Sequence, residues 1–270
     1  MSAVFLAFAW CVGSAIGSFL NVCILRWPKS ESVVRPRSRC PKCGAMIAWY
    51  DNIPLLSFLI LGAKCRNCQQ SIPWRYPIVE ACTAIAFALC VFKLGVTLVG
   101  VKYAILSAIL ITLVATDLED RILPDEFTLG GALLGLLFSP FVHLERYLIS
   151  VLLPYRWGLT VDSIAESIFG AVVGGGSIWL IAYLYQKYRH KEGLGLGDVK
   201  MIVMLGAFLG LRYALQTLIL ASVLGAVVGM IFIAATKKDS KTYELPFGTF
   251  LGATALILVM LGEVFASHAQ

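Results

Sequence analysis

Residues 2–25 read SAVFLAFAWCVGSAIGSFLNVCIL, and this stretch contains no charged side chain before it ends at Arg26-Trp-Pro. About 20 consecutive apolar residues are enough for an α-helix to cross the hydrocarbon core of a bilayer. The stretch is too long for the apolar core of a signal peptide, and it lacks the basic segment that precedes such a core. We therefore predict that residues 2–25 form a transmembrane helix that stays in the protein.

The rest of the chain has the same apolar character. Hydrophobic residues make up 59% of the 270 residues, charged residues make up 14%, and the mean hydropathy is +0.83. A soluble domain has about 45–50% apolar and about 25% charged residues, so the composition excludes a disordered chain, a disulfide scaffold and an ordinary soluble enzyme. Further uncharged runs lie at 78–98, 104–116, 127–142, 168–185, 199–211, 215–235 and 245–265. Together the runs predict an all-α integral membrane protein with about eight transmembrane helices.

The positive residues predict the orientation of these helices. Most of the 22 Lys and Arg residues lie in alternate loops, at 26–77, 117–126, 186–200 and 236–244. Because cytoplasmic loops carry an excess of Lys and Arg, we expect these loops to face the cytosol and segment 144–167 to be an external connection. The same rule accounts for the net charge of +6. The charge therefore indicates a lipid bilayer as the partner and no nucleic acid.

The polar segment between the first two predicted spans contains two CxxC pairs, Cys40-Pro-Lys-Cys43 and Cys65-Arg-Asn-Cys68. Two such pairs supply the four thiolates of a tetrahedral structural zinc site. Two disulfides are the alternative, which a reducing cytosol disfavours. We therefore predict a cytosolic zinc-binding insertion with Cys40, Cys43, Cys65 and Cys68 as ligands. The other cysteines lie in predicted spans, where we expect small packing residues: Cys11, Cys23, Cys82 and Cys90.

Two aspartate motifs lie at the predicted cytosolic ends of spans. Asp117 follows the third run and leads to Leu123-Pro124-Asp125, and Asp198 follows Gly195-Leu-Gly197 before the sixth run. Ionisable groups at the border of a span usually mark a pathway or a reaction site. Two carboxyl groups in a poorly hydrated site seldom ionise together, so one can take a proton from water while the other protonates a departing amine. This chemistry predicts an aspartyl protease with Asp117 and Asp198 as the catalytic pair.

Alternatives exist at both motifs. Asp117 is preferred for its closeness to the apolar run, and its rivals are Glu119, Asp120, Asp125 and Glu126. Gly195 and Gly197 are expected to allow close approach of the backbone and positive φ, whereas Asp198 by itself also suits a helix N-cap. The alternative function is a proton-coupled secondary transporter with a zinc-ribbon regulatory segment, although no internal repeat is evident and the aspartates lie at a membrane edge and not at the midplane. A membrane scaffold with a zinc ribbon is a third interpretation.

The chain resembles the bacterial type IV prepilin peptidases, which are integral-membrane aspartyl proteases with a GxGD motif. The blocks that carry the resemblance are Gly17-Ser-Phe-Leu-Asn21-Val-Cys23, the two CxxC pairs, Asn52-Ile-Pro54-Leu-Leu-Ser57, Arg75-Tyr-Pro-Ile-Val-Glu80, Asp117 with Leu123-Pro124-Asp125, and Gly195-Leu-Gly197-Asp198-Val-Lys200. The blocks span nearly the whole chain, and two CxxC pairs before two aspartate motifs form a specific pattern.

The resemblance implies a bifunctional enzyme of the bacterial inner membrane. It implies that Asp117 and Asp198 remove the basic leader of a prepilin or pseudopilin at the cytosolic face, and that S-adenosylmethionine then methylates the new N-terminus. The implied domains are a first transmembrane helix (1–26), a zinc-binding segment (27–76) and a transmembrane protease domain (77–270). The family often has Gly-Lys or Gly-Arg directly before the second CxxC pair, where this chain has Ala63-Lys64. Since no nucleotide-binding fingerprint is present, methylation is implied by the resemblance alone.

A few residues inside the apolar runs have structural interpretations beside functional ones. We expect Asn21 to form an interhelical hydrogen bond, the alternative being a substrate contact. We expect Glu80 to have a structural role such as pairing with Arg75, the alternative being assistance to the aspartates. The run Gly174-Gly-Gly176 is expected to allow close packing of helices.

Overall fold

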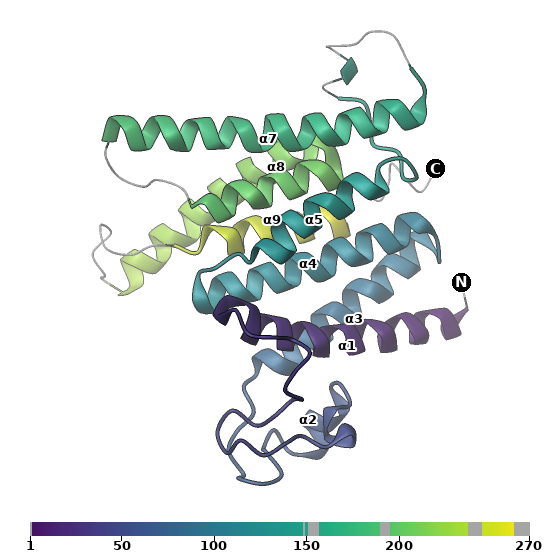
Figure 1. Cartoon of the computed structure of the whole chain (residues 1–270), viewed down its shortest axis with the longest axis vertical. Coiled ribbons are helices and arrows are strands. Elements are labelled where there is room, and N and C mark those ends of the chain that lie inside the picture. The colour runs from purple at the N-terminus through teal and green to yellow at the C-terminus, as the bar shows by residue number, and fades with distance from the viewer. Residues whose placement is uncertain (1, 148, 151–156, 190–194, 237–244, 262–270) are drawn as a thin grey trace. The chain divides into compact units, whose positions relative to one another are not determined.

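The computed structural model describes the chain apart from residues 1, 148, 151–156, 190–194, 237–244 and 262–270. The described chain is all-α, and its β pairing is limited to two isolated bridges. Figure 1 labels the helices in chain order. They are α1 (Ala3–Arg26), α2 (Leu56–Ile60), α3 (Arg75–Leu94), α4 (Leu98–Asp120), α5 (Asp125–Phe138), α7 (Leu159–Arg189), α8 (Leu196–Thr236) and α9 (Phe247–Leu261), with 3-10 turns η1 (Trp27–Lys29) and η2 (Trp49–Asn52).

The chain forms two compact units, and their boundary falls inside α4. Met1–Thr116 belongs to the first unit and Asp117–Leu261 to the second. The last turn of α4, with Asp117, therefore belongs to the second unit. The predicted domains 1–26, 27–76 and 77–270 were defined by their expected roles, whereas these two units are defined by compactness. The three-domain division therefore stays a prediction.

Small residues let α1 and α3 approach closely in the first unit. A Cβ atom on Gly13 would lie 2.8 Å from Ala84 Cα, and one on Gly17 would lie 2.7 Å from Glu80 Cα. Two small residues four positions apart on one helix are typical of close packing between membrane helices. Figure 1 shows α1 lying along α3 as a result.

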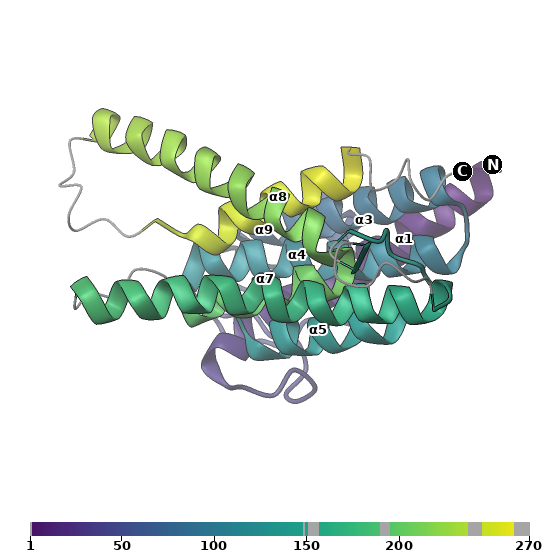
Figure 2. The same ribbon diagram turned by 90° about the horizontal axis from the view of Figure 1, so that it is seen from above.

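The second unit is organised around α8, which contacts α5, α7 and α9. The helix is broken at Gly210, which has φ 80° and ψ 173°. Because only glycine adopts such a conformation readily, the chain can fold back there, and the two parts of α8 run in different directions (Figure 2). The first part meets α7 backbone to backbone, since a Cβ atom on Gly206 would lie 2.2 Å from Gly170 O. Close packing is also confirmed at Gly175, where a Cβ atom would lie 2.2 Å from Val203 Cγ2.

The described residues form eight helices, but not all of them are membrane spans as predicted. Within the described residues, five helices are long and apolar enough to cross a membrane, namely α1, α3, α4, α7 and α8, and α9 is a shorter apolar helix. The runs 199–211 and 215–235 both fall in the folded α8. The run 127–142 became α5, whose 14 residues rise about 21 Å at 1.5 Å per residue and cannot cross about 30 Å unaided. In these places an apolar run therefore did not correspond to a separate full crossing.

The boundaries of two helices also differ from the predicted runs. The predicted run begins at residue 104, yet α4 begins at Leu98 and Lys102 is fully buried within it. The predicted external segment 144–167 includes the start of α7, whose buried side chains hold the preceding loop. Ser163 Oγ donates to Ser139 O at 2.7 Å, and Glu166 Oε2 accepts the N–H groups of Tyr147 and Ile149 at 3.2 Å.

Candidate active site and metal centre

The two predicted aspartates lie near each other in the second unit. Asp117 is in the last turn of α4, and its side chain is buried. Asp198 is in the first turn of α8 and is half-buried. Their carboxyl groups are close enough for a direct electrostatic interaction. The structure thus brings together two groups that are far apart in the sequence.

Thr249, near the start of α9, holds the Asp117 side chain in place. Its hydroxyl donates to Asp117 Oδ2 at 2.8 Å, and its backbone N–H donates to the same oxygen. Gly248 leaves room for this contact, because a Cβ atom there would lie 3.1 Å from Asp117 Cγ. Two donors to one carboxyl oxygen fix the orientation of that group. The contacts therefore hold the Asp117 carboxyl group in one position.

Gly197, directly before Asp198, acts through close approach. A Cβ atom on Gly197 would lie 3.2 Å from Leu123 Cβ, so Leu123 packs directly against the glycine motif. Gly197 does not use the positive φ that glycine allows, and the φ of Gly195 depends on residue 194, which lies outside the described residues. The Asp198 N–H donates to Gly195 O at 3.1 Å. Asp198 is therefore inside the first turn of the helix, three positions past the N-cap residue Gly195, and it is not itself the N-cap.

The four rival acids are placed differently from Asp117. They are all exposed: Glu119, Asp120, Asp125 and Glu126. Asp125 also forms an ion pair with Lys200, whose Nζ lies 2.7 Å from Asp125 Oδ1. This pair joins α5 to α8 through the last residues of the two aspartate motifs. Burial therefore favours Asp117 over its neighbours as a reacting group.

The four predicted metal ligands form one cluster in the first unit. Their Sγ atoms all lie within 4.8 Å of one another, in Cys40, Cys43, Cys65 and Cys68. The Sγ atoms of Cys40 and Cys68 are 3.8 Å apart, close to the separation of about 3.8 Å expected for two thiolates on a tetrahedral zinc with Zn–S of about 2.3 Å. The cluster can therefore hold a metal ion such as zinc.

Hydrogen bonds prepare two of these thiols for metal binding. The backbone N–H of Ala45, together with the side-chain amide of Asn67, lowers the pKa of Cys43 to about 6. The backbone N–H groups of Cys68 and Asn67 likewise lower the pKa of Cys65. The thiolate is the form that binds metals. The local backbone therefore favours the protonation state that a metal site needs.

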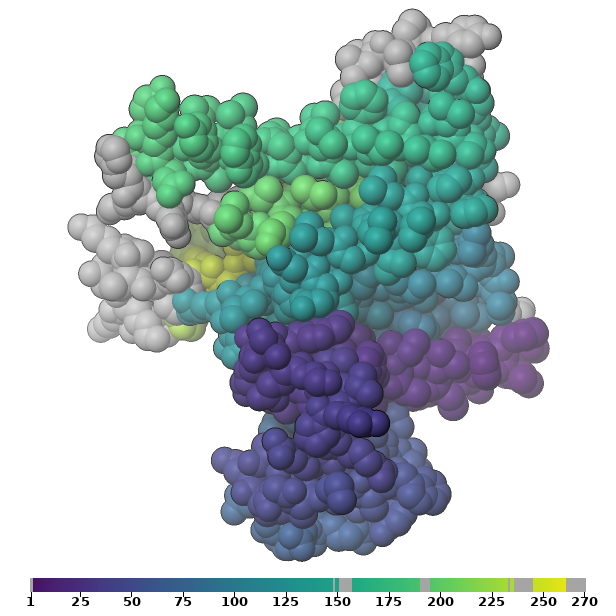
Figure 3. All heavy atoms as spheres, viewed as in Figure 1, coloured from purple at the N-terminus to yellow at the C-terminus, as the bar shows by residue number. Residues whose placement is uncertain are grey.

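The cysteine segment contains two copies of one hairpin, which the cysteine spacing alone did not reveal. In the first copy Cys40 N–H donates to Ala45 O at 2.9 Å, and in the second Cys65 N–H donates to Gln70 O at 2.8 Å. The isolated bridges fall at equivalent positions, Arg39 with Met46 and Lys64 with Ser71. The signal was present in the sequence, where Cys-x-x-Cys-x-x-x-Ile-x-Trp occurs twice, ending at Trp49 and Trp74. Figure 3 shows the segment between α1 and α3 as a compact mass.

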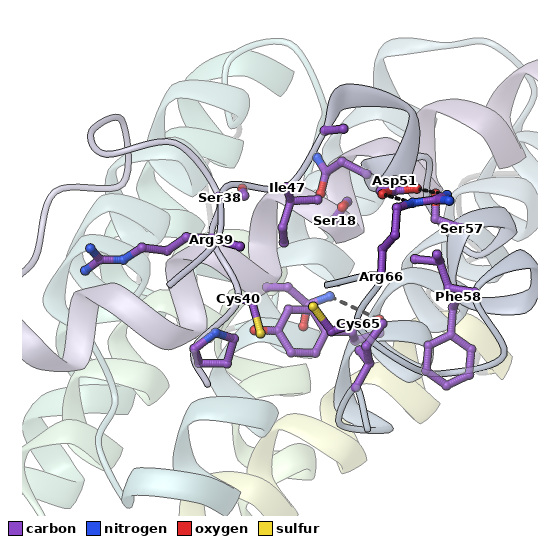
Figure 4. Close-up of a pocket in the computed structure, with 18 of the residues that line it drawn as sticks. Ser18, Ser38, Arg39, Cys40, Ile47, Asp51, Ser57, Phe58, Cys65 and Arg66 are labelled. Atoms are coloured by element: carbon purple, nitrogen blue, oxygen red, sulfur yellow. Dashed lines mark hydrogen bonds and ion pairs between the residues drawn. The ribbon is translucent and has the colours of Figure 1, made fainter. Parts of the chain in front are cut away.

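A cavity of about 450 Å³ lies beside the cysteine cluster, and Figure 4 shows part of its lining. Asn21 Nδ2 on α1 donates to Tyr76 O on α3 at 3.0 Å, so the predicted interhelical hydrogen bond is confirmed. Glu80 Oε2 accepts the N–H of Leu55 at 2.8 Å, and Leu55 has a φ of 60° that is rare for a residue with a side chain. Glu80 therefore has a structural contact with the backbone of Leu55, while its predicted pairing with Arg75 stays a prediction. Three of the sequence blocks, around Asn21, Leu55 and Glu80, meet at this cavity.

The contact of Thr249 with Asp117 and the unpaired Oδ1 atom of Asn21 were not predicted from the sequence. Thr249 follows Pro246-Phe-Gly248 at the start of the last apolar run. A proline and a small residue at the start of a helix indicate a boundary, but nothing local indicates that the boundary reaches Asp117, which lies 132 positions earlier.

Comparisons with known proteins cover nearly the whole chain. Residues 11–94 match the family described as the bacterial peptidase A24 N-terminal domain, and residues 104–230 match the type IV leader peptidase family. A prepilin leader peptidase/N-methyltransferase of Myxococcus xanthus is 41% identical over 241 residues, which cover 89% of this chain and 67% of that protein. Proteins of the same name from Pseudomonas putida and Pseudomonas aeruginosa are each 32% identical, covering 99% and 96% of this chain and 95% and 92% of their own lengths. No solved structure matches the chain.

Proposed function

The chain belongs to the type IV leader peptidase family and is a prepilin leader peptidase/N-methyltransferase, and we propose that Asp117 and Asp198 carry out its proteolysis. The observation that carries this proposal is the contact of Thr249 with a buried Asp117, beside a half-buried Asp198. The full-length similarity to peptidases leaves the transporter and the scaffold without a supporting observation.

The two aspartates take different roles in this proposal. Asp117 accepts hydrogen bonds from the hydroxyl and the N–H of Thr249, which hold its carboxyl group in position to take a proton from the attacking water. Asp198 carries the shared proton, polarises the scissile carbonyl group, and then passes the proton to the departing amine. No covalent intermediate with the chain forms. Gly248 and Gly195 leave space beside the two carboxyl groups, because Cβ atoms there would lie 3.1 Å from Asp117 Cγ and 3.4 Å from Asp198 Oδ2.

We propose a basic leader followed by an apolar helix as the substrate, presented at the cytosolic face of the inner membrane. Such a substrate has a polar part that stays in water and an apolar part that enters from the bilayer. The excess of Lys and Arg in alternate loops supports this orientation of a multi-pass membrane protein.

The orientation predicts a difference in access to the cysteine segment. Arg37 and Lys42 are exposed sites for trypsin in that segment. Trypsin added to inverted inner-membrane vesicles is expected to cut there, whereas trypsin added to intact spheroplasts is expected to leave the segment whole. Immunoblotting of the fragments measures this, and cleavage in spheroplasts would reverse the orientation.

Zinc is proposed to be a structural ion held by Cys40, Cys43, Cys65 and Cys68, whose four sulfur atoms fit a closed tetrahedral site. S-adenosylmethionine is proposed to supply the methyl group for the new N-terminus. When bound, this cofactor provides an electrophilic methyl group on a sulfonium centre. The residues of the chain have to bind it and hold the terminal amine beside it.

Mass spectrometry of a purified prepilin incubated with the protein tests the proposed function. The expected result is loss of the leader, followed by a gain of one methylene group when S-adenosylmethionine is present. A prepilin that keeps its full mass in the presence of active wild-type preparations would overturn the assignment of this substrate.

The contact between Thr249 and Asp117 predicts the effect of Thr249→Val. The change keeps the volume and the backbone N–H but removes the hydroxyl donor. A hydrogen bond to a charged group contributes about 1.5–3 kcal/mol, so we expect kcat for leader cleavage to fall by about tenfold or more, with a smaller change in KM. Thr249→Ser should restore most of the rate. Undiminished kcat in Thr249→Val would mean that the hydroxyl does not position Asp117 during the reaction.

A further inference from the structure

The cavity beside the cysteine cluster is separate from the proteolytic residues. Its lining belongs to the first unit, whereas Asp117 and Asp198 belong to the second. Its walls come from α1, α3, η2, α2 and both CxxC hairpins. A volume of about 450 Å³ lies in the range of about 300–1,000 Å³ that is typical of sites for cofactors and other small molecules. The cavity is therefore large enough for a methyl donor.

A buried polar atom in the cavity has no hydrogen-bond partner among the described residues. Asn21 is 1% exposed, and its Nδ2 donates to the carbonyl oxygens of Gly17 and Tyr76. These two bonds fix the orientation of the amide and leave Oδ1 without a donor. A buried acceptor left unpaired costs about 1–3 kcal/mol. A ligand that donates an N–H group to this oxygen would remove that cost.

The other side chains around the cavity carry mixed charge and flat rings. Acidic and basic groups are both present, as Glu80, Asp51, Arg26, Arg39 and Lys42. The rings of Tyr50, Phe58 and Tyr76 also line it. Figure 4 shows Asp51 and Arg66 paired at its edge, by hydrogen bonds of 2.7 and 2.8 Å. A ligand that fits this lining has positive and negative groups, an N–H donor and a flat ring.

S-adenosylmethionine has all of these features. Its sulfonium and amino groups are cationic, its carboxylate is anionic, and its purine is flat and carries an exocyclic amine. We propose that this cavity binds S-adenosylmethionine and that Asn21 Oδ1 accepts one of its N–H groups. The proposal rests on the methyltransferase function given above.

The reaction that this site would serve balances without a further reactant. The neutral terminal amine of the cleaved pilin attacks the methyl carbon and forms a carbon–nitrogen bond. The carbon–sulfur bond breaks with its electron pair going to sulfur, which leaves S-adenosylhomocysteine. The methylated ammonium group then releases one proton to water.

Direct binding measurements test the assignment on the purified full-length protein. Ala48 lines the cavity in an extended backbone conformation that any residue can adopt, so Ala48→Trp would place an indole in the space. We expect this variant to bind radiolabelled S-adenosylmethionine and S-adenosylhomocysteine at least about tenfold more weakly. Val34→Trp is the matched control, because Val34 is 77% exposed and does not line this cavity, and its affinity should stay within about twofold of wild type.

Photo-crosslinking of radiolabelled S-adenosylmethionine to the wild-type protein does not depend on the folding of a variant. The label is expected in peptides that contain residues 18–26, 48–58 or 76–80. Two results would overturn the assignment of S-adenosylmethionine to this cavity while leaving the proposed function intact. They are label confined to residues 117–261, and wild-type affinity for the cofactor in a folded Ala48→Trp protein. A wild-type protein that neither binds the cofactor nor methylates a cleaved pilin would overturn the methyltransferase assignment as well.

Discussion

Asp117→Asn and Asp198→Asn are each expected to lower kcat for leader cleavage by about a thousandfold or more. An amide at either position cannot carry the proton that the pair has to move between water and the leaving amine. A positioned acid or base contributes about 10²–10⁴-fold to a rate, and the two aspartates act as one unit. Asparagine keeps the volume of each side chain, so the loss should come from chemistry. Mass spectrometry of a prepilin over a time course measures the rate.

Asp125→Asn is the matched control for these variants. Asp125 belongs to the same motif as Asp117, but its side chain is 57% exposed and its partner is Lys200. An exposed ion pair contributes about 0–1 kcal/mol, so the change should reduce cleavage by no more than about fivefold. Zinc content equal to wild type in all three variants would show that the first unit stays intact. Cleavage near the wild-type rate in either Asp117→Asn or Asp198→Asn would remove that residue from the catalytic pair.

The parts of the fold that the sequence predicted are those that depend on local composition. An uncharged run such as 2–25 has to be helical in a bilayer, because a helix satisfies all of its own backbone hydrogen bonds. The two thiols of a CxxC pair likewise lie within four residues, so their spacing is fixed locally. The two pairs together form the expected cluster. The catalytic pair could be proposed from the sequence because both aspartates stand at the ends of such runs.

The parts that the sequence did not predict depend on contacts between distant residues. The break in α8 depends on a single residue, Gly210, inside a long apolar stretch that holds other glycines with regular helical geometry. Lys102 is charged and lies outside the predicted run 104–116, yet the fold buries it completely in α4. Thr249 reaches Asp117 across 132 positions. Hydropathy and motif spacing describe single segments, and neither contains information on which segments meet.

Ala63 departs from the family pattern at a position where the backbone has a positive φ. The residue stands where relatives of this kind often have glycine, and its φ is 58°, a region that glycine adopts with the least strain. Lys64 follows it directly and forms the bridge with Ser71 that closes the second hairpin. The departure therefore lies in the backbone of the hairpin that carries Cys65 and Cys68, next to the cavity.

Cys40→Ser is expected to abolish zinc binding and to unfold the cysteine segment. Within the described residues 27–74, Cys40 is the one hydrophobic side chain that is buried, while Met46 and Trp49 are 76% and 74% exposed. A segment without an apolar core depends on its metal for stability, and structural zinc contributes about 10–16 kcal/mol of apparent binding free energy in zinc-finger peptides. Three remaining cysteines cannot complete the closed site, so the hairpins would lose their common anchor.

Cys11→Ser separates this effect from the loss of any thiol, because Cys11 is an exposed cysteine of α1 outside the cluster. Elemental analysis should find about one zinc per chain in the wild-type and Cys11→Ser proteins and almost none in Cys40→Ser. Trypsin should cut the segment much faster in Cys40→Ser than in either of the others. Full zinc content together with wild-type resistance to trypsin in Cys40→Ser would mean that the hairpins are held by contacts other than the metal. Slow digestion with no zinc would instead show that the hydrogen bonds of the two hairpins stabilise the segment by themselves.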